Sequence, residues 1–326
     1  MKVFVSGGAG FIGSHLTRRL LTDKSVEQVV IYDNFSLGKM WHLGETVNDP
    51  RVIVICENIK EFQKLTTAMT GADVVFHLAS NSDIAKAIAC PDVDFWEGTY
   101  LTQNVLEAMR INGVKKIFYT SGSGVYGELG LHECAEGHGP LLPISTYGAS
   151  KIAGEAMICS YCHMFEMTGL VFRFANVVGP KQTHGVGYDF VRRLRENPTV
   201  LRILGDGTQS KSYIHVDDIL DAMFLVGETS TEEYDCFNVA TEDYITVKQI
   251  ADIVAEQMGL KKVQYEFTGG DRGWRGDVPV VRFNLKKIHT LGWRPKRTSF
   301  VAVRDAVNTM ITETASNLQP SFCAGT

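Results

Sequence analysis

The chain has 326 residues, of which 44% are hydrophobic and 21% charged, with 31 glycines and 9 prolines. This composition is typical of a folded globular protein, and at roughly 100–200 residues per domain the length predicts one large or two unequal domains. The formal net charge of −5 gives no general attraction to nucleic acid or to an anionic membrane. We therefore expect a small-molecule ligand held by local groups, and neither nucleic acid nor membrane as a partner.

The cysteines and the apolar runs exclude several other classes of protein. The seven cysteines are scattered and lack the paired spacing of a zinc site, so no metal site is expected. Cys159-x-x-Cys162 precedes His163, but the segment has the pattern of a continuing helix, and we expect no redox or haem role for it. No apolar run approaches the roughly 18 residues of a membrane span, and the amino terminus does not resemble a signal peptide. Together these features predict a protein of the reducing cytoplasm.

Short apolar runs alternate with longer helical patterns through the first half of the chain, which predicts a parallel sheet with crossover helices. The expected strands cover residues 2–6, 28–32, 52–56, 73–77, 116–120 and 170–173. The expected helices cover residues 12–22, 59–69, 94–111 and 146–167. The last two are long, and long helices on the flank of such a sheet often pair across a dimer interface, so we expect a homodimer.

After about residue 175 the alternation gives way to glycine-rich loops, with short elements near 187–196 and 201–204. Helical patterns at 216–226 and 246–258, with a strand near 237–239, indicate that the chain returns to the first lobe. We therefore expect an α/β fold in two parts. One is a doubly wound parallel Rossmann sheet over 1–175, with return segments near 213–241, and the other is a smaller α/β substrate lobe over 176–326.

A glycine-rich turn follows the first expected strand. Gly7, Gly10 and Gly13 have G-x-x-G-x-x-G spacing between a strand and an amphipathic helix. Glycines there permit a tight turn and let the backbone approach a pyrophosphate, whose charge then meets the free N–H groups at the start of the helix. The alternative is a merely tight turn, but the strand and helix on either side favour a dinucleotide site that also includes Phe11 and Ile12.

A carboxylate follows at the end of the second expected strand. Asp33 lies 20 residues after Gly13, where it would accept hydrogen bonds from an adenosine ribose and repel a 2′-phosphate. This position favours NAD over NADP. The polar loop that continues from it, and that could close over the adenosine, includes Asn34, Ser36 and Gly38.

The third and fourth expected strands also end in cofactor candidates. Asn58, followed by Ile59, either faces the adenine or caps the next helix, and the sequence leaves both roles open. Leu78, Ala79 and Ser80 follow the fourth strand at the carboxyl edge of the sheet, where ligands of open α/β sheets bind. We expect backbone contacts between this segment and the cofactor.

Tyr147 and Lys151 are four residues apart in an expected helix, so the phenol and the ammonium share one face. A tyrosine with a pKa near 10 is a poor base at neutral pH, but a neighbouring lysine and a positive nicotinamide favour the phenolate. Tyr147 can then remove a proton from a substrate hydroxyl as hydride leaves the same carbon. Such a pair is usually a surface coincidence when it stands alone. Because this pair follows a predicted dinucleotide loop in the chain, we interpret it as catalytic.

Six motifs spread over nearly the whole chain share their spacing with one family. They are Gly7-x-x-Gly10-x-x-Gly13, Asp33-Asn34, His77-Leu78-Ala79, Tyr147-x-x-x-Lys151, Arg173-Phe174-Ala175-Asn176-Val177-Val178-Gly179-Pro180 and Gly205-Asp206-Gly207-Thr208-Gln209. With them the chain resembles the extended short-chain dehydrogenase/reductases that act on nucleotide sugars, and among these the UDP-glucose (UDP-galactose) 4-epimerases of archaeal type. The resemblance implies tightly bound NAD, oxidation of a UDP-hexose at C4, rotation of the 4-keto sugar and return of the hydride to its opposite face.

The turn before Tyr126 departs from the family pattern. Family members usually have Ser or Thr four residues before this tyrosine, where it hydrogen-bonds the reacting hydroxyl, but here that position is Gly122. We expect Ser121 or Ser123 to supply the hydroxyl, and we favour Ser121 because it lies at the strand end; alternatively, both serines only cap the turn. The 4,6-dehydratases need an acid and a base at the positions of Ser123 and Gly124, and related decarboxylases keep a glutamate. The absence of such acidic and basic side chains at these positions favours epimerisation or simple 4-keto redox chemistry.

The resemblance also points to residues for the nucleotide part of the substrate. Asn176 resembles the family's asparagine that contacts substrate phosphate, although a turn role is the alternative. Lys211 stands where relatives usually have an arginine, and lysine offers the charge without the bidentate fork. Of Arg272 and Arg275, we expect only one to reach the diphosphate, and either can equally be a solvated surface residue. Gly98, where the family often has an asparagine near the cofactor, is a further departure.

The leading hypothesis is thus a nucleotide-sugar 4-epimerase that needs no external oxidant. Its closest rival is a nucleotide-sugar reductase or dehydrogenase, which would release changed cofactor at each turnover. A 4,6-dehydratase is less favoured, and a dinucleotide-sensing protein with weak catalysis has only Gly122 as an argument. The sequence leaves the sugar and the base open.

Overall fold

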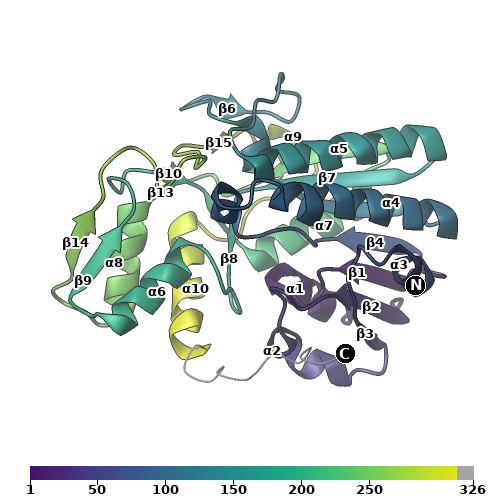
Figure 1. Ribbon diagram of the computed structural model, residues 1–326, viewed down its shortest axis with the longest axis horizontal. Helices are drawn as coiled ribbons and strands as arrows, with labels where there is room; N and C mark the ends of the chain where they lie inside the picture. Colours follow the sequence, from purple (N-terminus) through teal and green to yellow (C-terminus); the bar gives the residue numbers. More distant parts are fainter. Residues whose placement is uncertain (314–326) are drawn as a thin grey trace.

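In a computed structural model that describes residues 1–313, a seven-stranded sheet runs through the larger part of the molecule (Figure 1). Its strands are β1 (Lys2–Ser6), β2 (Gln28–Asp33), β3 (Val52–Cys56), β4 (Val74–His77), β5 (Lys116–Gly122), β7 (Thr168–Phe174) and β12 (Tyr234–Val239). They lie in the order β12-β7-β5-β4-β1-β2-β3, and every neighbouring pair is parallel. The chain order reverses between β1 and β4, at the switch point where doubly wound sheets bind ligands. The predicted α/β Rossmann architecture is confirmed.

Helices cover both faces of this sheet. α1 (Phe11–Leu20) and α7 (Val216–Thr229) pack on one face, whereas α3 (Phe62–Ala68), α4 (Tyr100–Asn112) and α5 (Thr146–Phe165) pack on the other. In β1, Val3 and Val5 belong to the first hydrophobic cluster and Phe4 to the second, because successive side chains of a strand point to opposite faces. Burial on both faces explains why the strands appear in the sequence as continuous apolar runs.

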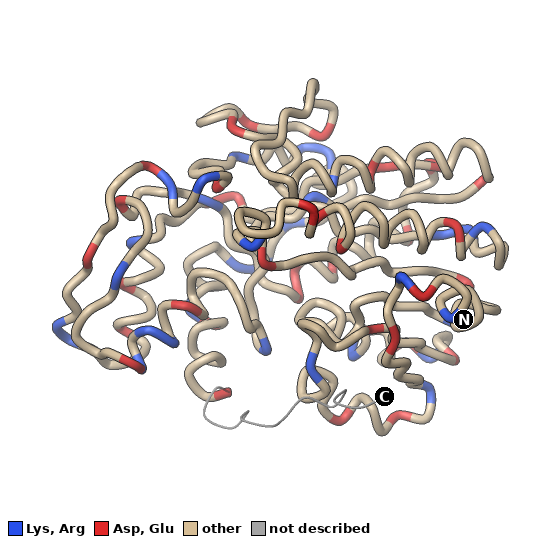
Figure 2. The backbone as a smooth tube through the Cα atoms, in the orientation of Figure 1, with Lys and Arg blue, Asp and Glu red and all other residues tan. Residues whose placement is uncertain are grey.

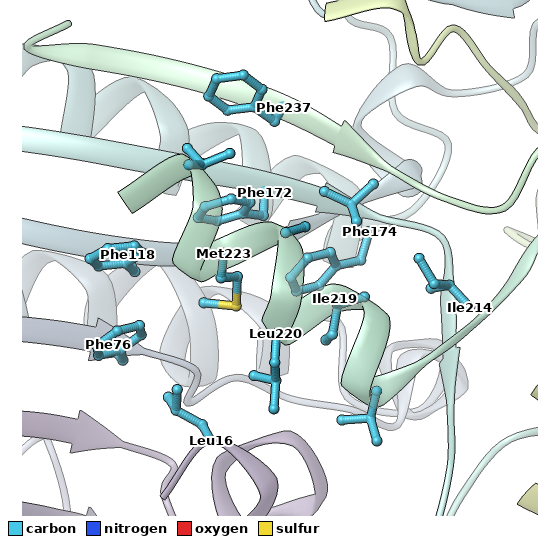
Figure 3. Packing of buried hydrophobic residues seen from close by; sticks show 14 of the residues in the cluster. Leu16, Phe76, Phe118, Phe172, Phe174, Ile214, Ile219, Leu220, Met223 and Phe237 are labelled. Carbon is cyan, nitrogen blue, oxygen red and sulfur yellow. The ribbon is translucent and has the colours of Figure 1, made fainter. Parts of the chain in front are cut away.

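Four phenylalanines from adjacent strands form the centre of the first cluster. The ring centroids of Phe76 and Phe118 are 4.4 Å apart, those of Phe118 and Phe172 are 6.2 Å apart, and those of Phe172 and Phe237 are 6.4 Å apart. Helix α7 lies over this row and turns Met223 toward it (Figure 3). Because Phe237 belongs to β12, this packing joins a late segment of the chain to the sheet formed by the first half.

Two helices begin later than the sequence predicted. α3 starts at Phe62 rather than at residue 59, because Asn58 forms a turn in which its Oδ1 accepts a hydrogen bond from the Lys60 N–H at 3.0 Å. The predicted helix 94–111 opens with a π-helical turn (Phe95–Thr99), and α4 follows it.

The smaller part of the molecule lies on the left in Figure 1. It contains α6 (Val186–Glu196), α8 (Val247–Gln257) and α10 (Ser299–Glu313), together with the parallel pair β9 (Val200–Ile203) and β14 (Gln264–Phe267). A third hydrophobic cluster holds these elements together. The shorter elements are α2 (Met40–Leu43), β6 (Glu133–Cys134), β8 (Asn176–Val178), β10 (Ser210–Lys211), β11 (Tyr213–His215), β13 (Ile245–Thr246), β15 (Arg282–Phe283) and α9 (Lys286–Thr290).

Acidic and basic residues are interspersed along both parts of the chain (Figure 2). Among residues 1–313, no helix combines the length and the apolar character that crossing a bilayer requires. Within the same range, no group of three or more His, Cys, Asp or Glu side chains could hold a metal ion.

Candidate active site

A cavity of about 980 Å³ extends along the carboxyl ends of β1, β2, β4 and β5 and reaches α6 and α10 of the smaller part. Its size is at the upper end of the range for ligand pockets. All the residues predicted to bind the cofactor lie in its wall: Gly7, Gly10, Phe11, Ile12, Gly13, Asp33, Asn34, Ser36, Gly38, Asn58, Ile59, Leu78, Ala79, Ser80, Tyr147 and Lys151.

The glycine turn between β1 and α1 is packed too closely for side chains. A Cβ on Gly7, whose φ is +73°, would lie 2.7 Å from the Ala79 amide nitrogen, and one on Gly13 would lie 2.5 Å from the Gly7 carbonyl oxygen. The turn therefore presents bare backbone to the cavity. Because α1 begins at Phe11 with no acidic residue in its first turn, the positive end of its dipole is not neutralised there.

The Asp33 carboxylate is held by the backbone on either side. Its Oδ2 accepts a hydrogen bond from the Ala9 N–H at 2.9 Å, and its Oδ1 accepts one from the Phe35 N–H at 2.8 Å. A Cβ on Gly38 would lie 2.9 Å from both oxygens, so the loop that follows β2 lies directly on this carboxylate. Burial raises the pKa of Asp33. Each oxygen keeps a lone pair for a further donor, such as a ribose hydroxyl.

Asn58 does not cap α3, because the helix begins at Phe62 and its N-cap residue is Glu61, and contact with the adenine stays a prediction. The residue lines the cavity, and its side chain also closes the turn before α3. Next to it, Lys60 forms an ion pair with Glu97 at 2.5 Å. Glu97 also lines the cavity, and the sequence analysis did not identify it because its partner lies on another element.

Tyr147 and Lys151 come together on the first turns of α5. The helix is capped by Ser145, whose Oγ accepts a hydrogen bond from the Gly148 N–H at 3.1 Å. The Lys151 Nζ donates to the Thr120 carbonyl oxygen at 2.8 Å and lies 5.5 Å from the centre of the Tyr147 ring. The predicted juxtaposition of phenol and ammonium is therefore present.

Burial controls the protonation of this pair. It lowers the pKa of Lys151 to about 8, although Glu155 and Asp94 act in the opposite direction. It also raises the pKa of Tyr147 to about 12, and the Asp94 carboxylate adds to this effect. We expected the neighbouring lysine to favour the phenolate. Among the protein's own groups, however, the effect of burial on the pKa of Tyr147 is larger than the effect of this lysine.

The glycine-rich turn after β5 leaves room beside the tyrosine. A Cβ on Gly122 would lie 4.0 Å from the Tyr147 hydroxyl and 3.9 Å from the Phe174 carbonyl oxygen, which are ordinary van der Waals distances. Ser121 and Ser123 both line the cavity. However, the Ser121 hydroxyl donates to Glu155 Oε1 at 2.5 Å, so the serine favoured by the sequence has its proton engaged by a buried carboxylate.

Glu155 belongs to a buried polar network that the sequence analysis missed. Its carboxylate pairs with the Arg173 guanidinium at 2.6 Å, and both side chains are buried. Arg173 also donates to the Tyr126 hydroxyl at 3.0 Å. The spacing could have revealed Glu155, because it follows Lys151 by four residues and therefore lies on the same face of α5.

The wall of the cavity also includes the predicted Asn176 and Lys211, together with Arg193, which was not predicted. The Lys211 ammonium pairs with Asp277 Oδ1 at 2.6 Å, and the Arg193 guanidinium donates to the Arg202 carbonyl oxygen at 2.9 Å. Both cations are thus oriented by neighbouring acceptors within the wall of the cavity.

The structure does not bring Arg272 or Arg275 to this cluster. Arg272 is partly exposed and pairs with Glu128 at 3.1 Å and Asp271 at 3.0 Å, while Arg275 is exposed. Neither arginine lines the cavity, although Trp274 between them does. Their role toward a diphosphate therefore stays a prediction.

Residues 3–240 match the model of the NAD dependent epimerase/dehydratase family. The chain belongs to this family. It is 29% identical over 315 residues to a putative UDP-glucose 4-epimerase of Methanocaldococcus jannaschii, a match that covers 94% of this chain and 98% of that protein. It is 31% identical over 308 residues to a dTDP-glucose 4,6-dehydratase of an Actinoplanes species, covering 91% and 93%. A solved UDP-galactose 4-epimerase superposes with a TM-score of 0.84 and 36% identity, covering 96% and 99%.

Membership of this family makes the protein an NAD-dependent enzyme, and the observed cavity fits NAD. The bare turn at Gly7 and Gly13 leaves room for a pyrophosphate at the start of α1. The spare lone pairs of Asp33 suit a ribose diol, and Tyr147 and Lys151 line the same cavity.

Proposed function

We propose that this member of the NAD dependent epimerase/dehydratase family is a nucleotide-sugar 4-epimerase that inverts C4 of a UDP-hexose. The observation that carries the proposal is that Tyr147 and Lys151 line one cavity with the predicted dinucleotide site and with cations of the smaller part. The names of similar proteins, including UDP-glucose and UDP-galactose 4-epimerases, support the same reaction.

NAD, when bound, supplies the reversible redox chemistry at C4 of the sugar. The protein's own part is to move the proton of the C4 hydroxyl. Tyr147 takes this proton up as a phenolate and later gives it back as a phenol. The Lys151 ammonium, held by the Thr120 carbonyl oxygen, stabilises the phenolate before the proton is taken up and after it is returned. Because burial raises the pKa of Tyr147 to about 12, the positive charges of Lys151 and of a bound nicotinamide would both be needed to favour the phenolate.

The hydroxyl that assists Tyr147 is proposed to be that of Ser123. Ser121 donates its proton to Glu155, whereas Ser123 lies in the short turn Ser123–Tyr126 in the cavity wall. A hydroxyl with a free proton can donate to the C4 oxygen as negative charge develops on it.

Dehydratases are also among the relatives, but the residues of this chain favour epimerisation. Elimination of water across C5–C6 needs an acid and a base beside the sugar, and Ser123 and Gly124 provide neither. The buried carboxylate nearby, Glu155, is paired with Arg173 and hydrogen-bonded by Ser121. It is therefore held as a structural anion.

For the diphosphate we propose Lys211, Arg193 and Asn176, which all line the cavity. A dianionic group would compete with Asp277 for the Lys211 ammonium, and charge-assisted hydrogen bonds to phosphate are strong enough for that exchange. In this arrangement residues 1–175 with 213–241 hold the cofactor, and residues 176–326 hold the nucleotide sugar.

We further propose a homodimer formed through the outer faces of α4 and α5 and located in the cytoplasm. Ile111 at the end of α4 and Met164 near the end of α5 are 52% and 70% exposed. Single surface apolar residues are normal, but two at the ends of adjacent helices suit a symmetric contact. The mass of the protein in solution, measured by light scattering, tests the dimer.

Mass spectrometry of the products formed from a panel of UDP, dTDP and GDP sugars tests the proposed reaction. An epimerase yields a product of unchanged mass that separates from its substrate on a column, and only with its preferred nucleotide. Tyr147→Phe should abolish this product while NAD binding persists. Loss of the mass of water, a stoichiometric change in NADH absorbance, or no turnover of any sugar would each contradict the proposal.

A further inference from the structure

The loop after β2 forms the wall of the cavity beside Asp33. The residues of this loop that line the cavity are Asn34, Ser36, Leu37, Gly38 and His42. The loop is closed onto the glycine turn at Ala9, whose carbonyl oxygen accepts hydrogen bonds from the Lys39 N–H at 3.0 Å and from His42 Nδ1 at 2.7 Å. Because Leu37 lines the cavity with a side chain that is 49% exposed, the loop also forms the rim of the cavity.

A segment of the chain that follows β8 contacts the same loop. The Lys181 Nζ donates a hydrogen bond to the His42 carbonyl oxygen at 2.5 Å, across 139 residues of sequence. The ring of His42 is bonded to Ala9, and a carbonyl oxygen can only accept, so the ring carries its proton on Nδ1. Through its ring and its own carbonyl group, His42 therefore connects the glycine turn to the Lys181 ammonium.

The backbone at Lys181 is itself fixed by its neighbours. Its φ is +66°, in the left-handed region that favours glycine, and such a conformation persists only where the surroundings impose it. The Lys181 N–H donates to Glu313 Oε2 of α10 at 2.8 Å, and the Pro180 carbonyl oxygen accepts a hydrogen bond from His15 Nε2 of α1 at 2.9 Å. The lysine is thus presented to the loop from a fixed position.

We propose that Lys181 is a positioning residue for NAD: its ammonium holds the loop after β2 against the glycine turn and thereby slows the release of the cofactor. Lys181 does not line the cavity, so it acts through His42 and not by touching the cofactor. A retained cofactor suits the proposed epimerisation, which regenerates NAD within each turnover. The inference itself rests only on NAD binding at the glycine turn and Asp33, whichever reaction the sugar undergoes.

The test is the rate at which bound NAD exchanges with NAD in solution. Protein loaded with NAD is mixed with an excess of isotopically labelled NAD, and the bound cofactor is analysed by mass spectrometry after rapid gel filtration. Lys181→Met nearly keeps the length of the side chain but removes the charged donor, so it should release NAD about tenfold faster than wild type. Lys181→Arg keeps a donor and should stay closer to the wild-type rate.

Lys115→Met is the matched control. The Lys115 Nζ also donates to a backbone carbonyl oxygen, that of Phe165 at 2.8 Å, but neither residue lines the cavity. This variant should leave the exchange rate unchanged. All rates are measured below the temperature at which each cofactor-free protein begins to unfold, so that a general loss of stability does not contribute.

A second variant tests the connection through His42. His42→Leu removes the hydrogen bond to Ala9 but keeps the carbonyl group that Lys181 contacts, and it should also speed the exchange. If ring and ammonium act as one connection, the double variant with Lys181→Met should release NAD little faster than the faster single variant. If Lys181→Met does not fold, Lys181→Gln takes its place.

An unchanged exchange rate in a folded Lys181 variant that lacks the ammonium would overturn the proposal, as would effects that multiply in the double variant. Faster exchange in a protein that turns over no nucleotide sugar would uphold the proposal and contradict only the proposed function.

Discussion

Lys151 follows Tyr147 by one turn of α5, and its ammonium nitrogen lies 5.5 Å from the centre of the tyrosine ring. The same nitrogen donates to the Thr120 carbonyl oxygen on β5 at 2.8 Å. Helix and strand together therefore hold the cation of the active site in place. Because burial lowers the pKa of Lys151 to about 8, this cation is also a source of instability at neutral pH.

Replacement of Lys151 should change stability in a pH-dependent way. Folding lowers the lysine pKa from 10.5 to about 8, so between these values the unfolded chain binds more protons and the contribution of Lys151 to stability improves as pH rises. The free energy of unfolding of Lys151→Met, relative to wild type, should therefore fall by on the order of 2 kcal/mol between about pH 7 and pH 10. Denaturant unfolding at each pH measures it.

The control is Lys115→Met, which changes an exposed lysine near the same sheet. The difference in free energy of unfolding between Lys115→Met and wild type should stay constant over the same range of pH. A constant difference for Lys151→Met as well would mean that folding does not lower the pKa of this lysine.

The two serines beside β5 should respond differently to alanine substitution. Ser123→Ala should lower kcat by about tenfold, the worth of one hydrogen bond to a developing charge, with little change in stability. Ser121→Ala should chiefly lower stability, because the Glu155 carboxylate loses a donor at 2.5 Å. Steady-state kinetics and thermal unfolding of both variants distinguish these outcomes, and a reversed pattern would assign the hydroxyl to Ser121.

Because a Cβ on Gly122 would make only ordinary van der Waals contacts, this position offers a matched rescue of the Ser123→Ala variant. A serine there would fit, since its Cβ would lie 4.0 Å from the Tyr147 hydroxyl, and Gly122 has an extended backbone that any residue adopts. Gly122→Ser in the Ser123→Ala background should restore most of kcat, and Gly122→Ala in the same background should not.

Replacement of only one member of the buried pair Glu155 and Arg173 should strongly lower the free energy of unfolding. Glu155→Leu leaves the guanidinium buried without its carboxylate, which should lower the free energy of unfolding by about 3–5 kcal/mol. The double variant Glu155→Leu with Arg173→Met should lose less than Glu155→Leu alone. Denaturant unfolding measures both proteins, and additive losses would show that the two side chains do not act as a pair.

Much of the fold was predictable because it depends on local patterns. Val3, Phe4 and Val5 already indicate a strand that is buried on both faces, and the glycines around Gly10 indicate the turn into α1. The predicted start of α3 was three residues too early. The Asn58 side chain accepts a hydrogen bond from the Lys60 N–H and forms a turn in place of helix, and the hydrophobic periodicity does not reveal this hydrogen bond.

The polar network around the site was less predictable because it depends on contacts between distant segments. Asp94 and Thr146 meet across 52 residues, and Arg272 is held away from the cavity by Glu128, 144 residues before it. A sequence pattern marks the type of residue but not the partner that orients its side chain. Arg193 was missed for the same reason, because only the packing of α6 within the smaller part brings it to the cavity.

The cations that the smaller part contributes to the cavity wall should control substrate binding more than turnover. Lys211→Met should raise KM for the nucleotide sugar by about tenfold with kcat little changed, because it removes a contact made equally in the ground and transition states. The exposed Lys262→Met is the matched control and should change neither constant. Arg272→Met should also leave KM unchanged, and an equal rise in KM for Arg272→Met would show that this arginine reaches the substrate after all.

The most direct measurement of the central claim is an NMR assay of purified protein with UDP-glucose or UDP-galactose in D₂O, with no cofactor added beyond that bound. The account predicts that either sugar gives the same mixture of the two C4 epimers, with no deuterium at C4 and no change in NADH absorbance. Conversion that consumes or releases cofactor in proportion to product, a 4-keto sugar that has lost water, or no interconversion by a protein that binds NAD would contradict it.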